Sequence, residues 1–203
     1  MAFFDWVAHE ARIEHVKKYG HIMIDLETLS TKTNASIIEI AAVEFNKETG
    51  EIGDTFDVLI SPDDWVKNNR DINGSTLLWW MQQDKTLLSK FNNNSVSFLS
   101  SALNKFTDFY NHHTLCGENE KETIVWGNGS TMDITILQSA YEYFNKPIPW
   151  KYWAVNDVRT IVELNPEIKK NTIFSGDKHN PIDDCKHQIK YLVETLKSIK
   201  NNS

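Results

Sequence analysis

The chain has 203 residues, with 21 Lys and Arg against 28 Asp and Glu, so its formal net charge is −7. This length favours one domain, or one domain with an extension, and it is enough to bury a full apolar core without disulfides or a structural metal. The acidic balance argues against a broad basic surface that grips duplex DNA through many phosphates. It is compatible with an enzyme that handles nucleic acid in one charged pocket.

Cysteine usage and hydropathy indicate a cytoplasmic protein. Cys116 and Cys185 are the only cysteines and form no CxxC motif, which argues against a disulfide framework and a cysteine zinc site. No apolar run approaches the roughly 20 residues that span a bilayer, so no membrane contact is expected. The N-terminal segment is interrupted by Asp5 and lacks the apolar core of a signal peptide.

The N-terminal half begins with a helix and continues with strands. Residues 1–19 are predicted to form a helical extension, either packed on the domain or free as a partner-binding arm, and residues 20–203 to form the domain itself. Apolar runs at 21–26, 36–45 and 51–60 predict three strands. The turn residues at 47–50 favour an antiparallel meander.

Helices and strands alternate in the rest of the chain. Helices are predicted over 75–80, 85–91, 95–110, 132–144, 158–164 (capped by Asp157) and 182–199, and strands over 123–126 and 153–155. The two strand tryptophans, Trp126 and Trp153, are expected to be buried. A meander followed by strand–helix alternation predicts an α/β domain with a mixed five-stranded sheet flanked by helices.

Two carboxylates lie at the end of the first predicted strand. Asp25 and Glu27 are two residues apart, so both side chains point to the same side of the strand. Their mutual repulsion is relieved by a divalent cation, because Mg²⁺ and Mn²⁺ prefer hard oxygen ligands. The pair alone is weak evidence, since surface strands often carry such pairs.

Further acids open two later helices. Asp133 follows the strand at 123–126 and its Gly-rich turn, where the helix dipole alone would favour an acid. His179 precedes Pro181 in a polar loop, and Asp183 and Asp184 stand in the first turn of the last helix, where capping is the simpler explanation.

The order of these residues resembles the DEDDh branch of the DnaQ-like 3′-5′ exonucleases, which have an RNase H-like fold. The resemblance places the family's four carboxylates at Asp25, Glu27, Asp133 and Asp184, with Asp183 a weaker candidate, and its histidine at His179. Four segments are more specifically similar to exonuclease A of T-even phages and the Rv2179c-like exoribonucleases. These are 75–80, 126–133, 153–160 and 179–185. Met132 departs from the aromatic residue usual before the second Asp, and we expect only a small effect on packing.

The resemblance implies a two-metal-ion hydrolysis of phosphodiesters that releases nucleoside 5′-monophosphates. It makes the four carboxylates ligands of two Mg²⁺ or Mn²⁺ ions and His179 the general base. It also implies that Thr28 and Leu29 contact the terminal nucleotide, with Leu29 as a wedge between bases.

Other substrate contacts are less specific. Trp79 and Trp80 point about 100° apart on a helix, so one can pack in the core while the other offers a surface for base stacking. Arg159 is a candidate phosphate contact, although a surface role is the simpler reading. His187 is expected to be an ordinary helical side chain.

The sequence therefore predicts an exonuclease that acts on single-stranded DNA or RNA with a free 3′ end. The alternatives are a structure-specific endonuclease on the same fold and a non-catalytic nucleic-acid-binding module. The choice between DNA and RNA depends on local contacts to the 2′-OH and stays open. A homodimer is compatible with the aromatic surplus.

Overall fold

The computed structural model describes residues 2–83, 90–91, 95–114 and 122–201, with side chains from residue 10 onward. Cys116 lies outside the described residues. The predicted helix over 85–91 does so too, except for its last two residues, which are helical.

The sheet has five strands in the order β3-β2-β1-β4-β5. They are β1 (Gly20–Thr28), β2 (Ile37–Asn46), β3 (Ile52–Leu59), β4 (Ile124–Gly127) and β5 (Val155–Asp157). The first three form the antiparallel meander, while β4 runs parallel to β1 and β5 runs parallel to β4. The prediction of a mixed five-stranded sheet is confirmed.

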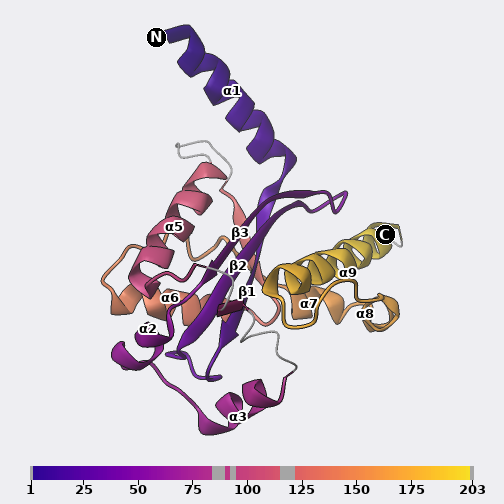
Figure 1. The fold of residues 1–203 in the computed structure, drawn as a ribbon. Helices are drawn as coiled ribbons and strands as arrows, with labels where there is room; N and C mark the ends of the chain where they lie inside the picture. The colour runs from indigo at the N-terminus through magenta and orange to yellow at the C-terminus, as the bar shows by residue number, and fades with distance from the viewer. Residues whose placement is uncertain (1, 84–89, 92–94, 115–121, 202–203) are drawn as a thin grey trace.

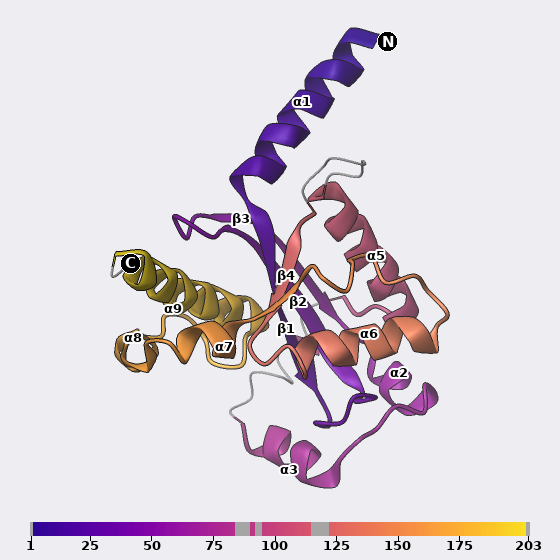
Figure 2. The ribbon, with the colours of Figure 1, turned by 180° about the vertical axis from the view of Figure 1, so that it is seen from behind.

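Helices lie on both faces of this sheet (Figures 1 and 2). They are α1 (Ala2–Lys18), α2 (Pro62–Lys67), α3 (Gly74–Gln82), α5 (Leu99–His112), α6 (Asp133–Tyr143), α7 (Val158–Val162), α8 (Pro166–Asn171) and α9 (Pro181–Asn201). Helices α5 and α6 cover one face, and α7 and α9 cover the other, so the domain has three layers.

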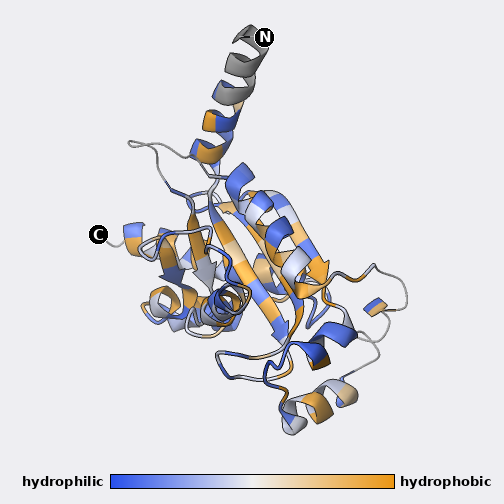
Figure 3. Cartoon of the chain, turned by 90° about the vertical axis from the view of Figure 1, so that its left-hand side faces the viewer, coloured by the Kyte–Doolittle hydropathy of each residue, from blue (hydrophilic) through white to orange (hydrophobic). Residues whose placement is uncertain are grey.

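The central strand β1 is buried on both faces. Ile22 and Ile24 pack with residues of α5 and α6, whereas Met23 packs with residues of α7 and α9. Apolar residues accordingly run along the strands between the helix layers (Figure 3). Because side chains alternate along a strand, Asp25 and Glu27 fall on the α9 side, in line with Met23.

Helix α5 begins at Leu99, four residues later than the sequence pattern predicts. The reason is tertiary. Ser97 bridges Ile60 beyond the end of β3, which keeps the preceding segment extended. The amide of Leu99 then donates to Asp64 Oδ2 at 2.5 Å, so an acid from α2 caps the helix. The short helices α2 and α8 each start at a proline and were not predicted.

The fifth strand also starts later than predicted, at Val155. Residues 152–154 form a turn in which the amide of Ala154 donates to the carbonyl of Lys151. Trp153 therefore points outward and is 61% exposed, which corrects the prediction that it is buried. Trp150 occupies the core instead, while Trp126 is buried as expected.

Helix α1 projects away from the layered domain (Figure 1). Near its C-terminal end Val16 is buried, and Lys18 Nζ donates to Glu51 Oε1 at 2.5 Å. The described part of α1 thus touches the domain through its last turns. No helix in the described part of the chain is both long and apolar enough to cross a membrane.

Candidate active site

Asp25 and Glu27 lie at the end of β1 that extends past the neighbouring strand β4. Strand β4 pairs with β1 only as far as Ile24, opposite Gly127, so the next residues of β1 extend beyond its carboxyl end. A side chain at Gly127 would press against Ile134 and the Ser130 backbone, because the chain turns sharply there. The two carboxylates therefore lie beyond the last residue pair of the β1–β4 ladder.

Asp133 approaches this end of β1 from the first turn of α6. Its Oδ1 accepts a hydrogen bond of 3.3 Å from the amide of Leu26, the residue between Asp25 and Glu27. The Asp133 carboxylate thus accepts a hydrogen bond from a β1 amide that lies beyond the end of the β1–β4 pairing. This bond ties α6 to the carboxyl-terminal end of β1.

Helix α9 supplies groups from the opposite side. Asp184 and Gln188 are one helical turn apart, and Gln188 Nε2 donates to Asp25 Oδ1 at 2.7 Å. Sequence reasoning missed Gln188, although its i+4 spacing from Asp184 was a usable signal. Its Oε1 is buried without a hydrogen-bond partner among the described residues.

His179 lies in the loop just before α9, in the left-handed backbone region with φ of 63°. Its ring, Glu27 and Asp184 each offer a ligand atom, and these atoms lie within 4.8 Å of one another. The ring also stands edge-on to Trp79, with centroids 4.9 Å apart. The histidine is thus held between the acids and an aromatic side chain.

Burial and mutual repulsion raise the pKa values of these acids. Burial, reinforced by the charge of Asp25, raises the pKa of Glu27 from 4.5 to about 10. Burial and then Asp133 raise the pKa of Asp25 well above its ordinary value. Burial raises the pKa of Asp133 to about 6 despite the Leu26 amide, and it raises that of Asp184 despite His179. The site concentrates more negative charge than the surrounding protein compensates.

Two further charged residues border the site and were not predicted. Glu39 is the β2 partner of Glu27, and Lys90 Nζ lies 2.6 Å from its Oε2. Burial and Asp57 raise the pKa of Glu39 to about 7, while Lys90 opposes the shift. No sequence motif marked this pair, because the strand register and the 90–91 segment bring it together.

Asp183 has a structural role, apart from the cluster. Its Oδ2 accepts from the amide of Asp177 at 2.9 Å, and its side chain packs against Gly176. The residue thus orders the loop that carries His179, which agrees with its ranking as the weaker candidate.

The residues predicted to contact substrate differ in their exposure to solvent. Trp79 is 40% exposed, whereas Trp80 is buried and its indole N–H donates to the carbonyl of Thr28 at 2.9 Å. The hydroxyl of Thr28 donates to the carbonyl of Ser30. Leu29 is only 2% exposed, in a core cluster with Trp80, so the wedge role would require it to leave the core.

Arg159 is an exposed residue of α7 that lies close to the site. Its guanidinium lies over Gly129, and its charge is one cause that lowers the pKa of Asp133. Asp157 caps α7 as predicted, since its Oδ1 accepts from the amide of Thr160, and its Oδ2 accepts from Ser130. The 126–133 turn and α7 are thereby fixed together.

The donor set fits divalent cations. Carboxylates from β1, α6 and α9 converge with too few positive groups to neutralise them, and hard oxygen ligands are those preferred by Mg²⁺ and Mn²⁺. A bound cation would remove the repulsion that the raised pKa values express.

Sequence comparison decides the family. Residues 20–196 match the family described as the 3′-5′ exoribonuclease Rv2179c-like domain. The chain belongs to this family. The match covers most of the chain and confirms the predicted resemblance. No protein with a curated description matches the chain.

Solved structures share the fold of this exoribonuclease family member. The nuclease domain of 3′hExo, a DEDDh family member bound to rAMP, is 19% identical with a TM-score of 0.59, covering 89% of this chain and 93% of that one. S. pombe Pop2p with Mg²⁺ and Mn²⁺ is 12% identical with a TM-score of 0.62, covering 97% and 91%. The zinc-bound E. coli ExoI–ssDNA complex is 14% identical with a TM-score of 0.58, covering 90% and 40%. These likenesses confirm the predicted exonuclease fold.

Proposed function

We propose that this chain is a metal-dependent 3′-5′ exonuclease that degrades single-stranded nucleic acid from a free 3′ end. The observation that carries the proposal is the convergence of Asp25, Glu27, Asp133 and Asp184 with His179 at one end of β1. We take RNA as the preferred substrate because the family is described as exoribonucleases. DNA hydrolysis is the alternative within the same chemistry.

We assign the four carboxylates to two Mg²⁺ or Mn²⁺ ions. When bound, such ions stabilise negative charge on the attacking and leaving oxygens of a phosphodiester. Asp25 stands between Asp133 and Asp184, both of which raise its pKa, so it is the natural shared ligand. Gln188 orients its carboxylate through the 2.7 Å hydrogen bond.

His179 is assigned the role of general base. A neutral imidazole nitrogen accepts a proton from the attacking water at near-neutral pH, and the charge of the neighbouring Asp184 stabilises the imidazolium that forms. The edge contact with Trp79 restricts where the ring can turn. The resulting product is a nucleoside 5′-monophosphate.

Trp79 is assigned to base stacking at the 3′ end. It is the half-exposed member of the tryptophan pair and lies beside His179, so a base stacked on it would bring the terminal phosphodiester near the acids. Trp80 packs edge-on against Trp79 and is itself held by its hydrogen bond to the Thr28 carbonyl. We assign Arg159 to a phosphate contact. Thr28 contributes through its backbone.

The test is hydrolysis of matched single-stranded RNA and DNA oligomers, labelled at the 5′ end and either free or blocked at the 3′ end. We expect ladders shortened by one nucleotide at a time from the free end only, with Mg²⁺ or Mn²⁺ required. Asp25→Asn should abolish the ladder. Asp63→Asn, an exposed acid on α2, should leave it unchanged.

Two results would contradict the assignment as an exonuclease and favour another function. Discrete internal cuts that persist with a blocked 3′ end would identify a structure-specific endonuclease. Oligomer binding without hydrolysis in either metal would identify a non-catalytic binding module.

We retain two further expectations from the sequence. A cytoplasmic location is supported by the cysteine usage. A homodimer is supported by the exposed apolar side chains Leu77, Leu78 and Met81 on α3, and sedimentation analysis would test it.

A further inference from the structure

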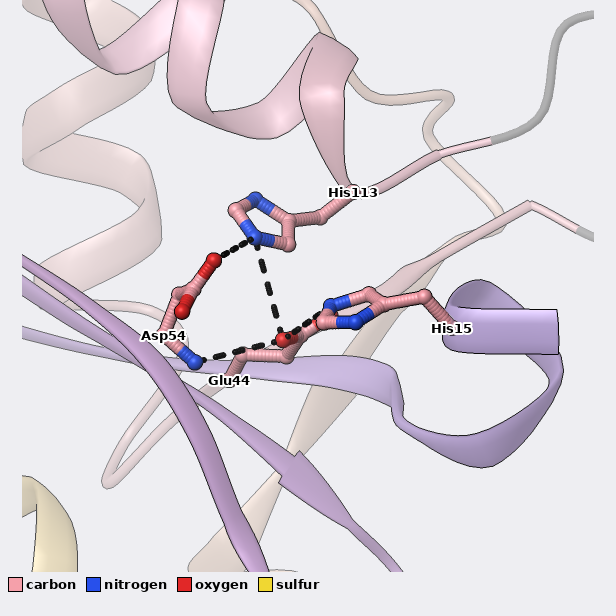
Figure 4. A group of neighbouring side chains, drawn as sticks. All are labelled: His15, Glu44, Asp54 and His113. Atoms are coloured by element: carbon pink, nitrogen blue, oxygen red, sulfur yellow. Dashed lines mark hydrogen bonds and ion pairs between the residues drawn. The ribbon is translucent and has the colours of Figure 1, made fainter. Parts of the chain in front are cut away.

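A second group of potential metal ligands lies away from the exonuclease site. His15 of α1, Glu44 of β2, Asp54 of β3 and His113 at the end of α5 turn their polar atoms toward one another (Figure 4). Each offers a ligand atom, and these four atoms lie within 4.8 Å of one another. Glu44 is paired with Ile22, three residues along the ladder from the pair of Asp25 and Ala41, a separation of roughly 10 Å.

The centre of this group is a buried carboxylate. Glu44 is fully buried, and its Oε2 lies 2.8 Å from His15 Nε2 and 3.7 Å from His113 Nε2. Its Oε1 is buried without any hydrogen-bond partner among the described residues. A side chain at Gly53 would overlap this carboxylate, so the glycine leaves the space that Glu44 occupies. An unpartnered buried carboxylate oxygen is costly unless a cation or proton satisfies it.

The tautomer of His113 points to a metal ligand. Its Nδ1 lies 2.7 Å from the carbonyl of Phe109, which can only accept, so Nδ1 carries a proton. In the neutral ring Nε2 then has a lone pair, yet it faces Asp54 Oδ2 at 3.0 Å as well as Glu44. The lone pair of His113 Nε2 and those of the Asp54 and Glu44 carboxylate oxygens repel one another. A metal ion bound by all three atoms would remove this repulsion. Metal-bound histidines commonly donate their other ring N–H to a carbonyl in this way.

We propose that His15, Glu44, Asp54 and His113 form a binding site for a first-row transition metal ion, with Zn²⁺ as the preferred occupant. Two imidazoles with two carboxylates suit zinc, whereas Mg²⁺ and Ca²⁺ prefer all-oxygen sites. Four ligands around zinc at about 2.0–2.1 Å are themselves roughly 3.3 Å apart. The spacings of 2.8, 3.0 and 3.7 Å bracket that value.

A metal ion bound at this site would hold the C-terminal part of α1 against the domain. The four ligands come from four elements, and His15 is the ligand that α1 contributes. Arg12 of the same helix also donates to the carbonyls of Asn111 and Thr114, on either side of His113. Metal binding would therefore order the end of α1 against β2, β3 and the end of α5 without involving the exonuclease acids.

The test is zinc titration of the full chain in an Asp25→Asn, Asp184→Asn background, which removes two ligands of the exonuclease site. Isothermal calorimetry with ZnCl₂ should show one tight equivalent, and bound Zn²⁺ should raise the Tm. Asp54→Asn, a nearly isosteric change at an exposed side chain, should weaken zinc binding by about 10-fold or more. His113→Ala should abolish it.

The matched control is His112→Ala, the exposed neighbouring histidine, which should bind zinc as the parent does. Failure of the parent to bind zinc would overturn the proposal and leave the group as a set of side chains that contact one another without a metal. Equal binding by the parent, His15→Ala and Asp54→Asn would overturn it as well. Because the readout is metal binding in a background that lacks two of the four acids assigned to the exonuclease site, the result does not depend on exonuclease activity.

Discussion

At the scale of single residues, the proposed exonuclease site is a set of carboxylates held close together at a cost in stability. Glu27 shows this most clearly, because burial and the charge of Asp25 shift its pKa to about 10. The unfolded chain loses that proton near pH 4.5, whereas the folded metal-free chain keeps it until about pH 10. In this window the unfolded state binds fewer protons, so the free energy of unfolding falls as pH rises.

Replacing this carboxylate should stabilise the metal-free protein. Glu27→Gln removes the titration, so we expect its Tm to match the wild type below about pH 4.5 and to exceed it increasingly toward higher pH. Thermal unfolding in the presence of a chelator over a pH series measures this. Glu142→Gln, an exposed position on α6, serves as the control and should show no growing difference. A wild type that is more stable than Glu27→Gln at about pH 8 would refute the electrostatic account.

Removing the proposed general base, His179, should impair chemistry more than folding. His179→Ala is expected to lower kcat by about 10²- to 10⁴-fold, the usual contribution of general base catalysis, as measured by hydrolysis of a single-stranded oligomer. His112→Ala should retain the wild-type rate. A wild-type kcat in His179→Ala would assign the base to another group.

At the scale of elements, the start of α9 positions two site residues at once. Asn180 Oδ1 accepts from the amides of Ile182 and Asp183, so the helix begins between His179 and Asp184. The left-handed backbone of His179 is held by this cap and by the Asp183–Asp177 bond. Placement of the base and of one acid therefore depends on a single helix terminus.

Loss of this cap should reduce both stability and activity. Asn180→Ala is expected to lower the free energy of unfolding by about 1 kcal/mol and to reduce kcat. The control is Asn46→Ala, because Asn46 Oδ1 likewise accepts from two amides, those of Glu48 and Thr49, in the hairpin between β2 and β3. We expect a similar loss of stability with unchanged kcat. Equal kcat in both variants would show that the cap does not position the site.

At the scale of the whole molecule, the active site joins the two layers of helices across the sheet. Asp133 comes from the α5–α6 side and Asp184 from the α9 side, and both meet at β1. A divalent ion held by these two acids would link all three layers. Ligands that bind only the folded state stabilise it by about 2.7 kcal/mol at 100 times their Kd.

Metal should therefore stabilise the entire domain. Saturating Mg²⁺ or Mn²⁺ is expected to raise the Tm of the wild type, and a chelator should reverse the shift. Asp25→Asn should lose most of this response. An equal metal response in wild type and variant would place the binding elsewhere.

The sequence by itself determined the order of the five strands and of the longer helices, and the identity of the candidate acids and histidine. Both follow from local signals. Hydropathy periods mark the elements, and the spacing of Asp25, Glu27, Asp133, His179 and Asp184 is a motif in the chain. The family match confirms the resemblance.

Only the tertiary structure decided contacts between distant segments. Gln188 reaches Asp25, Lys90 pairs with Glu39, and Asp64 caps α5 because the sheet brings these segments together. The same is true of Trp153, which a turn exposes, and of Leu29, which packs in the core. The cluster of His15, Glu44, Asp54 and His113 has no motif spacing, since its four residues come from four elements. Long-range packing has no local signature, so such contacts appear only once the chain is folded.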